Sequence, residues 1–280
     1  NVPTIVDYLN DGGYETVHIG FQHERYDAHV QTLFDAVNRS GYRENTLVIF
    51  TTDHGICAMR AKMTLYDRGV EIALLMQMPG TIGQGVVIPE LIQNIDIAPT
   101  LLDAAGVGVP ETMQGRSFWS LLTGGGRYAS HDAIFLERNW HLGNPPHLPP
   151  VTDWIYQGWD PVRAVRTPRF HYIRNFDPRN KKQWLPHEVP YMNETYDDWW
   201  DTLWPEPTLP RDPEELYDVA TDPDEFVNRA YDPAFCEVRR DLATRLDQWM
   251  RDTNDPLLDG PIPDRLNGWP EKGVTSHRSV

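Results

Sequence analysis

The sequence predicts an α/β protein, with a mostly parallel central sheet flanked by helices and a smaller C-terminal antiparallel sheet with a terminal helix. Two uninterrupted apolar runs, TLVIF at 46–50 and IALLMQM at 72–78, are typical of strands buried on both faces of a parallel sheet. Segments with helical periodicity lie around these runs, whereas the later part of the chain has short strand candidates. The 280 residues, 40% of them hydrophobic, suffice for a large domain with a smaller companion. We therefore expect an α/β core at 1–124 and an antiparallel subdomain at 125–280.

The N-terminal segment predicts a helix followed by a strand. Pro3 suits the first turn of a helix, the amphipathic pattern runs through Leu9, and Gly12 with Gly13 ends it. The run TVHIG at 16–20 then has the composition of a strand. This part predicts one helix–strand unit.

A second helix is expected within 25–42, with Gly41 at its C-terminal end. The strand TLVIF follows directly, and a further helix is expected at 92–107 with Pro99 in or near its first turn. This alternation of helix and strand favours the α/β class. The side chains expected on one face of the second helix are Ala28, Val30, Leu33, Phe34 and Val37.

The C-terminal part predicts strands at 132–138, 163–168 and 169–176. A Pro-rich and Trp-rich irregular segment at 185–213 is expected to form a lid or a surface cover. A terminal helix is expected at 236–253. The stripe of that helix expected to face the core consists of Val238, Leu242, Leu246 and Trp249.

The composition excludes several classes of function. A formal charge of -16 argues against a nucleic-acid partner, because backbone phosphates are bound by clustered Lys and Arg. Cys57 and Cys236 lie outside any CxxC pattern, so neither a disulfide framework nor a thiolate zinc site is indicated. No apolar run approaches the roughly 18 residues of a membrane span. The chain begins at Asn1 rather than at a methionine, which predicts a processed or truncated N-terminus.

A loop with several reactive side chains follows the TLVIF run. Asp53 and His54 come directly after the strand, where open α/β sheets bind ligands. A carboxylate oxygen beside an imidazole nitrogen can ligate a divalent metal, and Gly55 lets the backbone approach closely. Lys62 adds a compact cation for an anionic substrate. The alternative is structural: the acid caps the next segment, the imidazole is a polar loop residue and the lysine is solvated.

Further segments accompany this loop in a fixed order. TLVIFTTDHG, AKMTLYDRGVEIALLMQMPG and NIDIAPTLLDAAGVGVPETMQGRSFWSLLTG follow one another, and PTIVDYLNDGGYETVHIGFQHE precedes them. ERNWH, RAVRTPRFHYIRNFDPR, ELYDVATDPDEFVN and DPLLDGPIP come after them. Together these segments resemble the sulfatases of the alkaline phosphatase superfamily, whose upstream segment is usually written PTLADxLKxAGYxTxxxGKWHLG. The later segments resemble the bacterial branch similar to heparan N-sulfatase, so an alkaline phosphatase-like fold is implied.

The resemblance implies hydrolysis of sulfate esters or sulfamates, on sulfated saccharides, by a formylglycine and a bound metal. It implies Asp53 and His54 as metal ligands, with calcium favoured and manganese or zinc left open because one ligand is a nitrogen. Lys62 is implied to contact the sulfate and leaving-group oxygen, and His23 to hydrogen-bond the formylglycine or sulfate. Phe21 stands where the family has a lysine. A periplasmic or extracellular location is implied as well.

The chain departs from the family pattern at the nucleophile. The CxPSR or SxPSR motif that becomes formylglycine is absent, since Cys57 lies in ICAMR and Cys236 in FCEVR. The family's opening strand with paired aspartates, and a middle segment with another catalytic histidine, are absent as well. We therefore expect a sulfatase chain without its nucleophile region and middle segment.

Several other side chains have both a functional and a structural interpretation. His141, together with Glu137, is expected either to face the active-site cleft and bind substrate or to lie in a strand-end turn. Arg166 and Arg174 either line the same cleft or form a solvated edge. Cys57 is expected to fill space as a small apolar residue. The aromatic residues that either stack on sugar rings or anchor the long loop are Trp199, Trp200 and Trp204.

Two alternative functions stay open. The first is a phosphonate or phosphate ester hydrolase of the same superfamily, in which a DHG metal motif also occurs. The segment AKMTLYD and the order of the C-terminal segments favour a sulfatase over this alternative. The second is a non-catalytic remnant that binds a sulfated sugar or no ligand, which the missing nucleophile supports.

Overall fold

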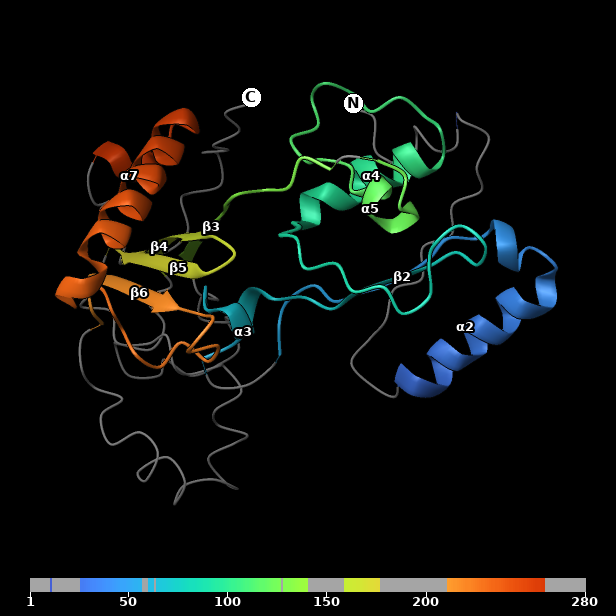
Figure 1. Ribbon diagram of the computed structural model, residues 1–280, viewed down its shortest axis with the longest axis horizontal. Coiled ribbons are helices and arrows are strands. Elements are labelled where there is room, and N and C mark those ends of the chain that lie inside the picture. Colours follow the sequence, from blue (N-terminus) through green and yellow to red (C-terminus); the bar gives the residue numbers. More distant parts are fainter. Residues whose placement is uncertain are drawn as a thin grey trace, which may run out of the picture. The chain divides into compact units, whose positions relative to one another are not determined.

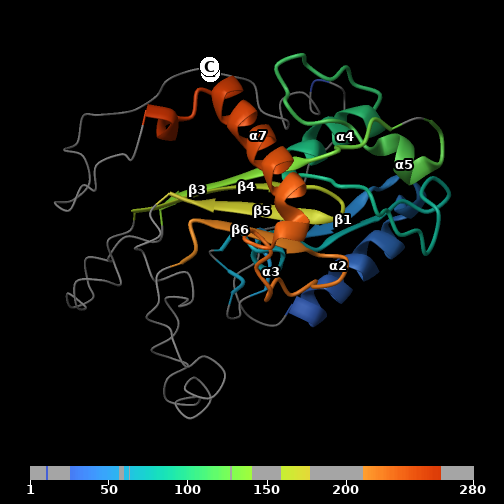
Figure 2. The same cartoon turned by 60° about the vertical axis from the view of Figure 1, so that its left-hand side comes forward.

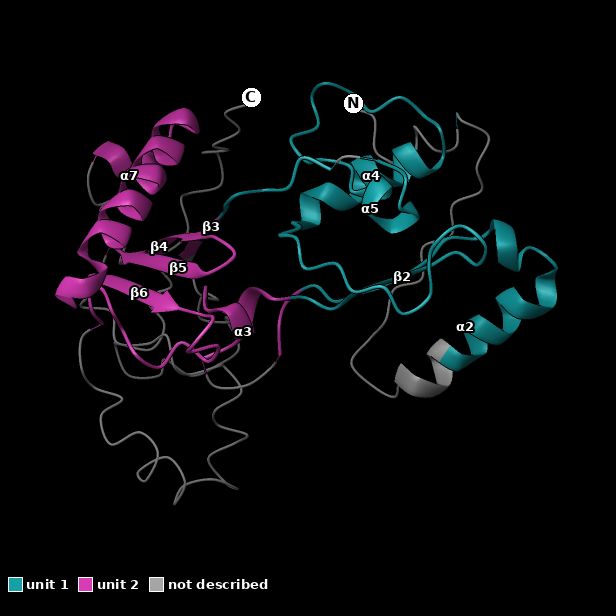
Figure 3. Ribbon diagram, viewed as in Figure 1, with its two compact units in different colours: residues 1–53, 72–134 teal, residues 54–71, 135–280 magenta. Residues whose placement is uncertain are grey.

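The computed structural model describes residues 11, 26–56, 60–62, 64–126, 128–140, 159–176 and 211–259. The chain divides into two compact units, coloured separately in Figure 3. Unit 1 comprises Asn1–Asp53 and Ile72–Ile134, and unit 2 comprises His54–Glu71 and Phe135–Val280. The segment after Asp53 is thus grouped with C-terminal residues, while the domain boundary near residue 124 stays a prediction. Outside the described residues lie the predicted helix through Leu9, the strand at 16–20 and the 185–213 segment before residue 211.

Helix α2 of unit 1 spans Tyr26–Ser40 and confirms the second predicted helix (Figure 1). Leu33, Phe34 and Val37 are half-buried, in agreement with the predicted apolar face. The helix ends before Gly41, whose φ of 79° is a left-handed conformation that glycine adopts without steric cost. A short 3-10 helix at Arg43–Asn45 follows.

Strands β1 and β2 form a two-stranded sheet in unit 1. They span Val48–Thr51 and Leu74–Gln77, which confirms both predicted apolar strands. The strands pair antiparallel, with Ile49 opposite Met76, so the expected parallel sheet is not among the described strand pairs. An apolar run reports the burial of its faces and not the direction of its neighbours. The described residues also leave Leu75 of β2 65% exposed, so this strand is not covered on both faces.

Helix α4, Ile97–Ala104, confirms the helix predicted around Pro99 and follows a 3-10 turn at Asn94–Asp96. The proline lies in the first turn, where its missing N–H would have no helical partner. A second short helix, α5 at Trp119–Thr123, was not predicted from the sequence.

Asp96 connects three segments of unit 1. Its carboxylate is buried and accepts the backbone N–H groups of Gln93 and Arg116 at 2.8 and 2.7 Å. Nε2 of His131 lies 2.9 Å from the same carboxylate. These contacts satisfy a charge that would be costly to bury without partners.

Unit 2 contains a four-stranded sheet in the order β3-β4-β5-β6. The pairs β4–β5 and β5–β6 are antiparallel, which confirms the predicted character of the C-terminal sheet. The three predicted strands correspond to β3, β4 and β5, whereas β6 was not predicted. The elements of unit 2 are α3 at Asp67–Val70, β3 at Ile134–Trp140, β4 at Trp159–Arg166, β5 at Phe170–Asn175, β6 at Glu214–Asp218, a 3-10 helix at Pro233–Phe235, α7 at Cys236–Asp252 and a 3-10 helix at Pro256–Asp259.

The terminal helix α7 packs against β4 and β5 (Figure 2). Leu242 and Leu246 are buried as predicted, and Met250 is buried one turn later. Trp249 is half-buried and stacks on Phe135 of β3 with a centroid distance of 5.2 Å. None of the described helices combines the length and apolar character needed to cross a membrane.

Candidate functional site

The segment His54–Glu71, called the Lys62 loop below, is closed at its base by backbone hydrogen bonds. Gly55 donates its N–H to the carbonyl of Gly69 at 2.9 Å. Lys62 donates its own N–H to the carbonyl of Ile56 at 3.1 Å. The loop therefore folds back on itself and fixes the backbone of its lysine.

Glycine is required at both ends of this closure. A Cβ on Gly55 would lie 2.0 Å from the carbonyl oxygen of Arg68, and a Cβ on Gly69 would lie 2.2 Å from that of Ala61. Both obstacles are backbone atoms, which cannot rotate away as a flexible side chain could. The two backbone segments approach too closely for any larger residue at these positions.

Three of the five predicted site residues lie within the described part of the chain. Asp53 is exposed directly after β1, and His54 is half-buried with Nδ1 2.7 Å from the carbonyl oxygen of the next residue. Lys62 is half-buried within its loop. His23 and His141 lie outside the described residues. The catalytic, metal-binding and substrate-binding roles of all five stay predictions.

Arg166 and Arg174 bind carboxylates of their own unit. The Arg166 side chain is 15% exposed and lies 2.8 Å from Asp67, while Arg174 is 22% exposed and lies 2.5 Å from Asp247 of α7. Both side chains therefore bind acids within unit 2, and their place at a cleft or a solvated edge stays a prediction. Glu137 of β3, in contrast, has a side chain that is 57% exposed. Outside the described residues lie Phe21, Cys57, Trp199, Trp200 and Trp204.

The Lys62 loop packs on the sheet of unit 2 through Leu65 and Tyr66, which are both buried. The Tyr66 hydroxyl donates to Oε2 of Glu215 at 2.8 Å. The rings of Tyr66 and Tyr217 pack edge to face with a centroid distance of 6.0 Å. The Arg60 guanidinium lies 4.0 Å from the centroid of the Tyr66 ring. The other buried members of this apolar cluster are Val162, Ala164 and Ile173.

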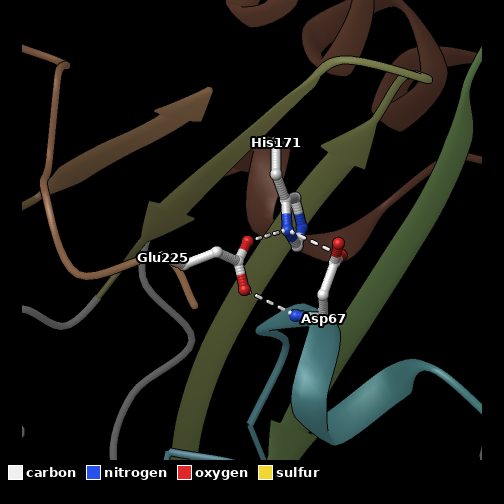
Figure 4. A group of neighbouring side chains, drawn as sticks. All are labelled: Asp67, His171 and Glu225. Atoms are coloured by element: carbon white, nitrogen blue, oxygen red, sulfur yellow. Dashed lines mark hydrogen bonds and ion pairs between the residues drawn. The ribbon is translucent and has the colours of Figure 1, made fainter. Parts of the chain in front are cut away.

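Three charged side chains from distant parts of the sequence meet beside this contact (Figure 4). Asp67 begins α3, His171 lies on β5 and Glu225 follows β6. Nδ1 of His171 is 2.6 Å from Oε1 of Glu225 and 3.4 Å from Oδ1 of Asp67. The second oxygen of Glu225 accepts the backbone N–H of Asp67 at 2.6 Å. His171 and Glu225 are 0% and 1% exposed, so water does not screen their charges.

Arg166 of β4 adds a fourth charge to this group. Its Nε and Nη2 donate to the Asp67 carboxylate at 2.8 to 3.0 Å. A guanidinium that contacts both oxygens of a carboxylate fixes the orientation of both groups. The ionic cluster, as we call it below, consists of Asp67, Arg166, His171 and Glu225.

The environment of His171 favours its charged form. Burial disfavours an imidazolium, but Glu225 and Asp67 outweigh this effect and raise the pKa of His171 to about 9. Burial also disfavours the Asp67 carboxylate, but hydrogen bonds from His171 and Arg166 hold the pKa of Asp67 well below its usual range. At neutral pH the cluster therefore contains two positive and two negative groups.

Asp67, His171 and Glu225 also have the donor types found in metal sites, with one ligand atom of each within 4.8 Å of the others. Sequence reasoning did not predict this cluster, because its members are far apart along the chain. A usable signal was that each member lies in a segment of the sulfatase resemblance: AKMTLYD, RFHYIRNF or DPDEFVN.

A family model described as N-sulphoglucosamine sulphohydrolase, C-terminal, matches residues 53–141. The match begins at the predicted metal ligands and includes the Lys62 loop. Of the segments that carry the sulfatase resemblance, it covers those from AKMTLYD to ERNWH.

Curated relatives match over a larger part of the chain. An ulvan-active sulfatase of Formosa agariphila is 29% identical over 273 residues, which are 91% of this chain and 41% of that protein. Arylsulfatase K of Mus musculus is 36% identical over 230 residues, or 79% of this chain and 33% of that protein. N-sulphoglucosamine sulphohydrolase of Homo sapiens is 28% identical over 87% of this chain and 49% of its own length. The chain thus spans between a third and half of the length of these relatives.

Solved structures share the fold. A 2-O GAG sulfatase superposes with a TM-score of 0.61 and 22% identity over 87% of this chain and 45% of that one. A phosphonate monoester hydrolase of Agrobacterium radiobacter superposes with a TM-score of 0.54 and 23% identity over 81% of this chain and 39% of that one. The family model and the curated relatives together identify the chain as a member of the sulfatase family.

Proposed function

We propose that this chain is part of a hydrolase that cleaves sulfate esters or sulfamates on sulfated saccharides. The observation that supports this most is the closed Lys62 loop, which fixes a lysine a few residues after the Asp53-His54 pair. Two relatives are named for action on ulvan and on N-sulphoglucosamine. A periplasmic or extracellular location, implied by the same family, belongs to the proposal.

A divalent metal fits the consecutive residues Asp53 and His54. The contact of 2.7 Å from Nδ1 of His54 to a carbonyl oxygen requires an N–H on Nδ1, which leaves the lone pair of a neutral imidazole on Nε2. Metal-binding histidines are commonly oriented by such a second hydrogen bond. We propose calcium as the ion, with manganese or zinc as alternatives because one ligand is a nitrogen. A bound ion would neutralise negative charge on the sulfuryl group.

Lys62 is proposed to bind the sulfate and the leaving-group oxygen. Its ammonium is a compact charge that suits a point contact to a tetrahedral anion. Its backbone N–H is fixed to Ile56, so the side chain extends from a defined position. The proposed roles of His23 at the nucleophile or sulfate, and of His141 at the saccharide, rest on the family resemblance.

The nucleophile is not among these 280 residues, since they contain no CxPSR or SxPSR motif. Cys57 and Cys236 lie in unrelated contexts. A formylglycine would therefore have to come from a part of the protein outside this sequence. By itself, the chain is proposed to bind sulfated ligands without turning them over.

A phosphonate or phosphate ester hydrolase is the second candidate, because a phosphonate monoester hydrolase shares the fold. Calorimetric titration in the presence of calcium separates the two candidates. We expect the chain to bind glucosamine N-sulfate more tightly than glucosamine 6-phosphate. A preference for the phosphate would favour the second candidate.

Lys62→Ala should weaken binding of glucosamine N-sulfate about ten-fold, because it removes one charge-assisted contact of about 1.4 kcal/mol. Arg240→Ala, which removes an exposed cation on α7, is the matched control and should leave affinity unchanged. Equal affinity of the Lys62→Ala variant and the unaltered chain would contradict the proposed role of the lysine.

A further inference from the structure

The Lys62 loop is attached to unit 2 on both sides of its lysine. On one side, the Arg60 guanidinium donates to the backbone carbonyl of Glu225. On the other side, the backbone N–H of Asp67 donates to the Glu225 carboxylate at 2.6 Å. One glutamate thus receives hydrogen bonds from residues that precede and follow Lys62.

Glu225 is itself held in an uncommon conformation. Its φ of 57° lies in the left-handed region, which non-glycine residues rarely adopt. Such a conformation persists only when surrounding contacts determine it. The side-chain contact at Oε1 is the 2.6 Å hydrogen bond from His171, which is completely buried on β5.

The charges of the ionic cluster balance only when His171 is protonated. Asp67 and Glu225 contribute two negative charges, and Arg166 contributes one positive charge through its contacts with Asp67. A neutral His171 would leave one negative charge uncompensated in the interior, which is costly. Nε2 of His171 has no partner among the described residues, so the charge is stabilised from the Nδ1 side alone.

A bound metal explains the same cluster less well. The Asp67 carboxylate already receives two guanidinium nitrogens, and the second Glu225 oxygen receives a backbone N–H. The separation of 2.6 Å between His171 and Glu225 is that of a charge-assisted hydrogen bond. A divalent ion would have to displace these donors and add charge beside Arg166. The donors present therefore favour a proton over a metal.

We propose that His171, as an imidazolium, is a positioning residue for Lys62: it holds Glu225 and Asp67 in place, and these two fasten the Lys62 loop to the sheet on either side of the lysine. The part of this proposal that concerns sulfate rests on the proposed function, whereas the attachment of the loop does not. His171 touches no substrate in this account and acts through the loop.

The groups named around His171 come from α3, from the loop after β6 and from the two strands beside β5. Asp67 faces it from α3 and Glu225 from the loop after β6. Its cross-strand partners are Arg166 on β4 and Tyr217 on β6. With the pKa of His171 raised to about 9, the loop should stay attached through neutral pH and loosen in alkali.

The first experiment measures the charge of His171 in the complete chain by NMR of imidazole nitrogens. We expect both ring nitrogens of His171 to carry protons at pH 7, and one of these two protons to be lost near pH 9. The variant His131→Gln lacks the buried histidine of unit 1, so the signals it loses are those of His131. The His171 signals should remain in place. A His171 that is neutral at pH 7 would overturn the proposal.

The second experiment measures attachment of the loop by limited trypsin digestion at about pH 8. We expect His171→Gln to accelerate cleavage after Arg60 and Lys62 by about ten-fold or more, whereas His131→Gln should not. Adding Glu225→Gln to His171→Gln restores charge balance and should slow this cleavage again, even if the single variant is poorly folded. Unchanged cleavage in the single variant, or no recovery in the double variant, contradicts the charge-based attachment.

Two further readouts separate the alternatives. In a chain carrying Asp53→Ala and His54→Ala, which removes the proposed metal ligands, zinc and calcium should leave cleavage of the loop unchanged. If either ion slows cleavage in that variant and EDTA reverses this, the ionic cluster is a metal site and the proposal is wrong. In calorimetry, His171→Gln should weaken binding of glucosamine N-sulfate in the unaltered chain but not in Lys62→Ala. If Lys62→Ala alone has no effect while the digestion results hold, the proposed function fails and the attachment stands.

Discussion

Buried charges attach the Lys62 loop more strongly than exposed ones do. Removing one member of a buried, hydrogen-bonded ion pair typically costs about 3–5 kcal/mol, because it leaves the partner uncompensated. Such a cost applies to His171 and Glu225, which are 0% and 1% exposed. Arg68 and Asp224 also form an ion pair, but their side chains are 44% and 42% exposed, so this pair contributes at most about 1 kcal/mol. Of the two ionic contacts of the loop, the buried cluster is therefore the stronger one.

The stability of the protein should depend on pH through His171. Its pKa of about 9 exceeds the value of about 6.5 in an unfolded chain, so its contribution is complete below pH 6.5 and lost as pH rises through 9. This difference corresponds to on the order of 3 kcal/mol. Burial and Glu215 raise the pKa of Tyr66 and of Tyr217 well above 10, so these tyrosines do not titrate in this range.

Denaturant unfolding at pH 6, 7.5 and 9.5 measures this dependence. The unaltered chain should lose stability between the last two values, and His171→Gln should lose much less. Asp67 acts with the opposite sign: its pKa is depressed, so its contribution is present above about pH 3.9 and is lost as pH falls. The same alkaline loss in both proteins would mean that another group is responsible.

At the residue level, the sequence predicts sites whose residues lie close together along the chain. Asp53, His54 and Lys62 lie within one short segment, so they could be proposed together. Asp67 and Glu225 are 158 residues apart, and only the fold brings them together. Without a strand register, nothing in the sequence pairs these carboxylates with His171.

At the scale of elements, periodicity and end signals were sufficient for helices. α2, α4 and α7 occur where apolar spacing, a proline in the first turn or a terminal glycine predicts them. β6 was not predictable because three of its five residues are acidic, so the sequence shows no hydrophobic alternation there. Four of the five residues are nevertheless buried. Strand direction in unit 1 was also not predictable, because it depends on which other segments become neighbours.

The closure of the Lys62 loop should not tolerate a side chain at position 55. Gly55→Ala places a Cβ 2.0 Å from a backbone oxygen, so the base of the loop must open. We expect a loss of about 1–3 kcal/mol in unfolding free energy, as for other overpacked sites, together with faster trypsin cleavage at Lys62. Gly108→Ala is the matched control, since nothing lies within 4 Å of a Cβ there. Similar behaviour of the two variants would show that the loop is not tightly closed.

At the scale of the whole molecule, the net charge is negative, whereas the proposed ligand-binding site needs positive charge. The formal charge of -16 repels anionic saccharides at long range, so the proposed binding of a sulfated saccharide must depend on local cations. The same charge attracts divalent cations toward the protein. Lys62 and the proposed metal at Asp53 and His54 would supply this local positive charge.

The family was predictable from the sequence because several segments occur in a characteristic order, and the antiparallel C-terminal sheet because short strand candidates follow one another closely. The parallel sheet was not found among the described residues, which pair β1 with β2 antiparallel. The chain also spans between a third and half of the length of the curated relatives described above.

The most direct test of this account is a calorimetric titration of calcium into the complete chain. We expect one binding event that is lost in Asp53→Ala and in His54→Ala. The control His171→Gln should retain it, because the ionic cluster is not the proposed metal site. Absence of calcium binding in the unaltered chain would contradict the proposed metal site. Binding that survives both alanine variants and disappears in His171→Gln would also contradict it, and would place the cation at the ionic cluster.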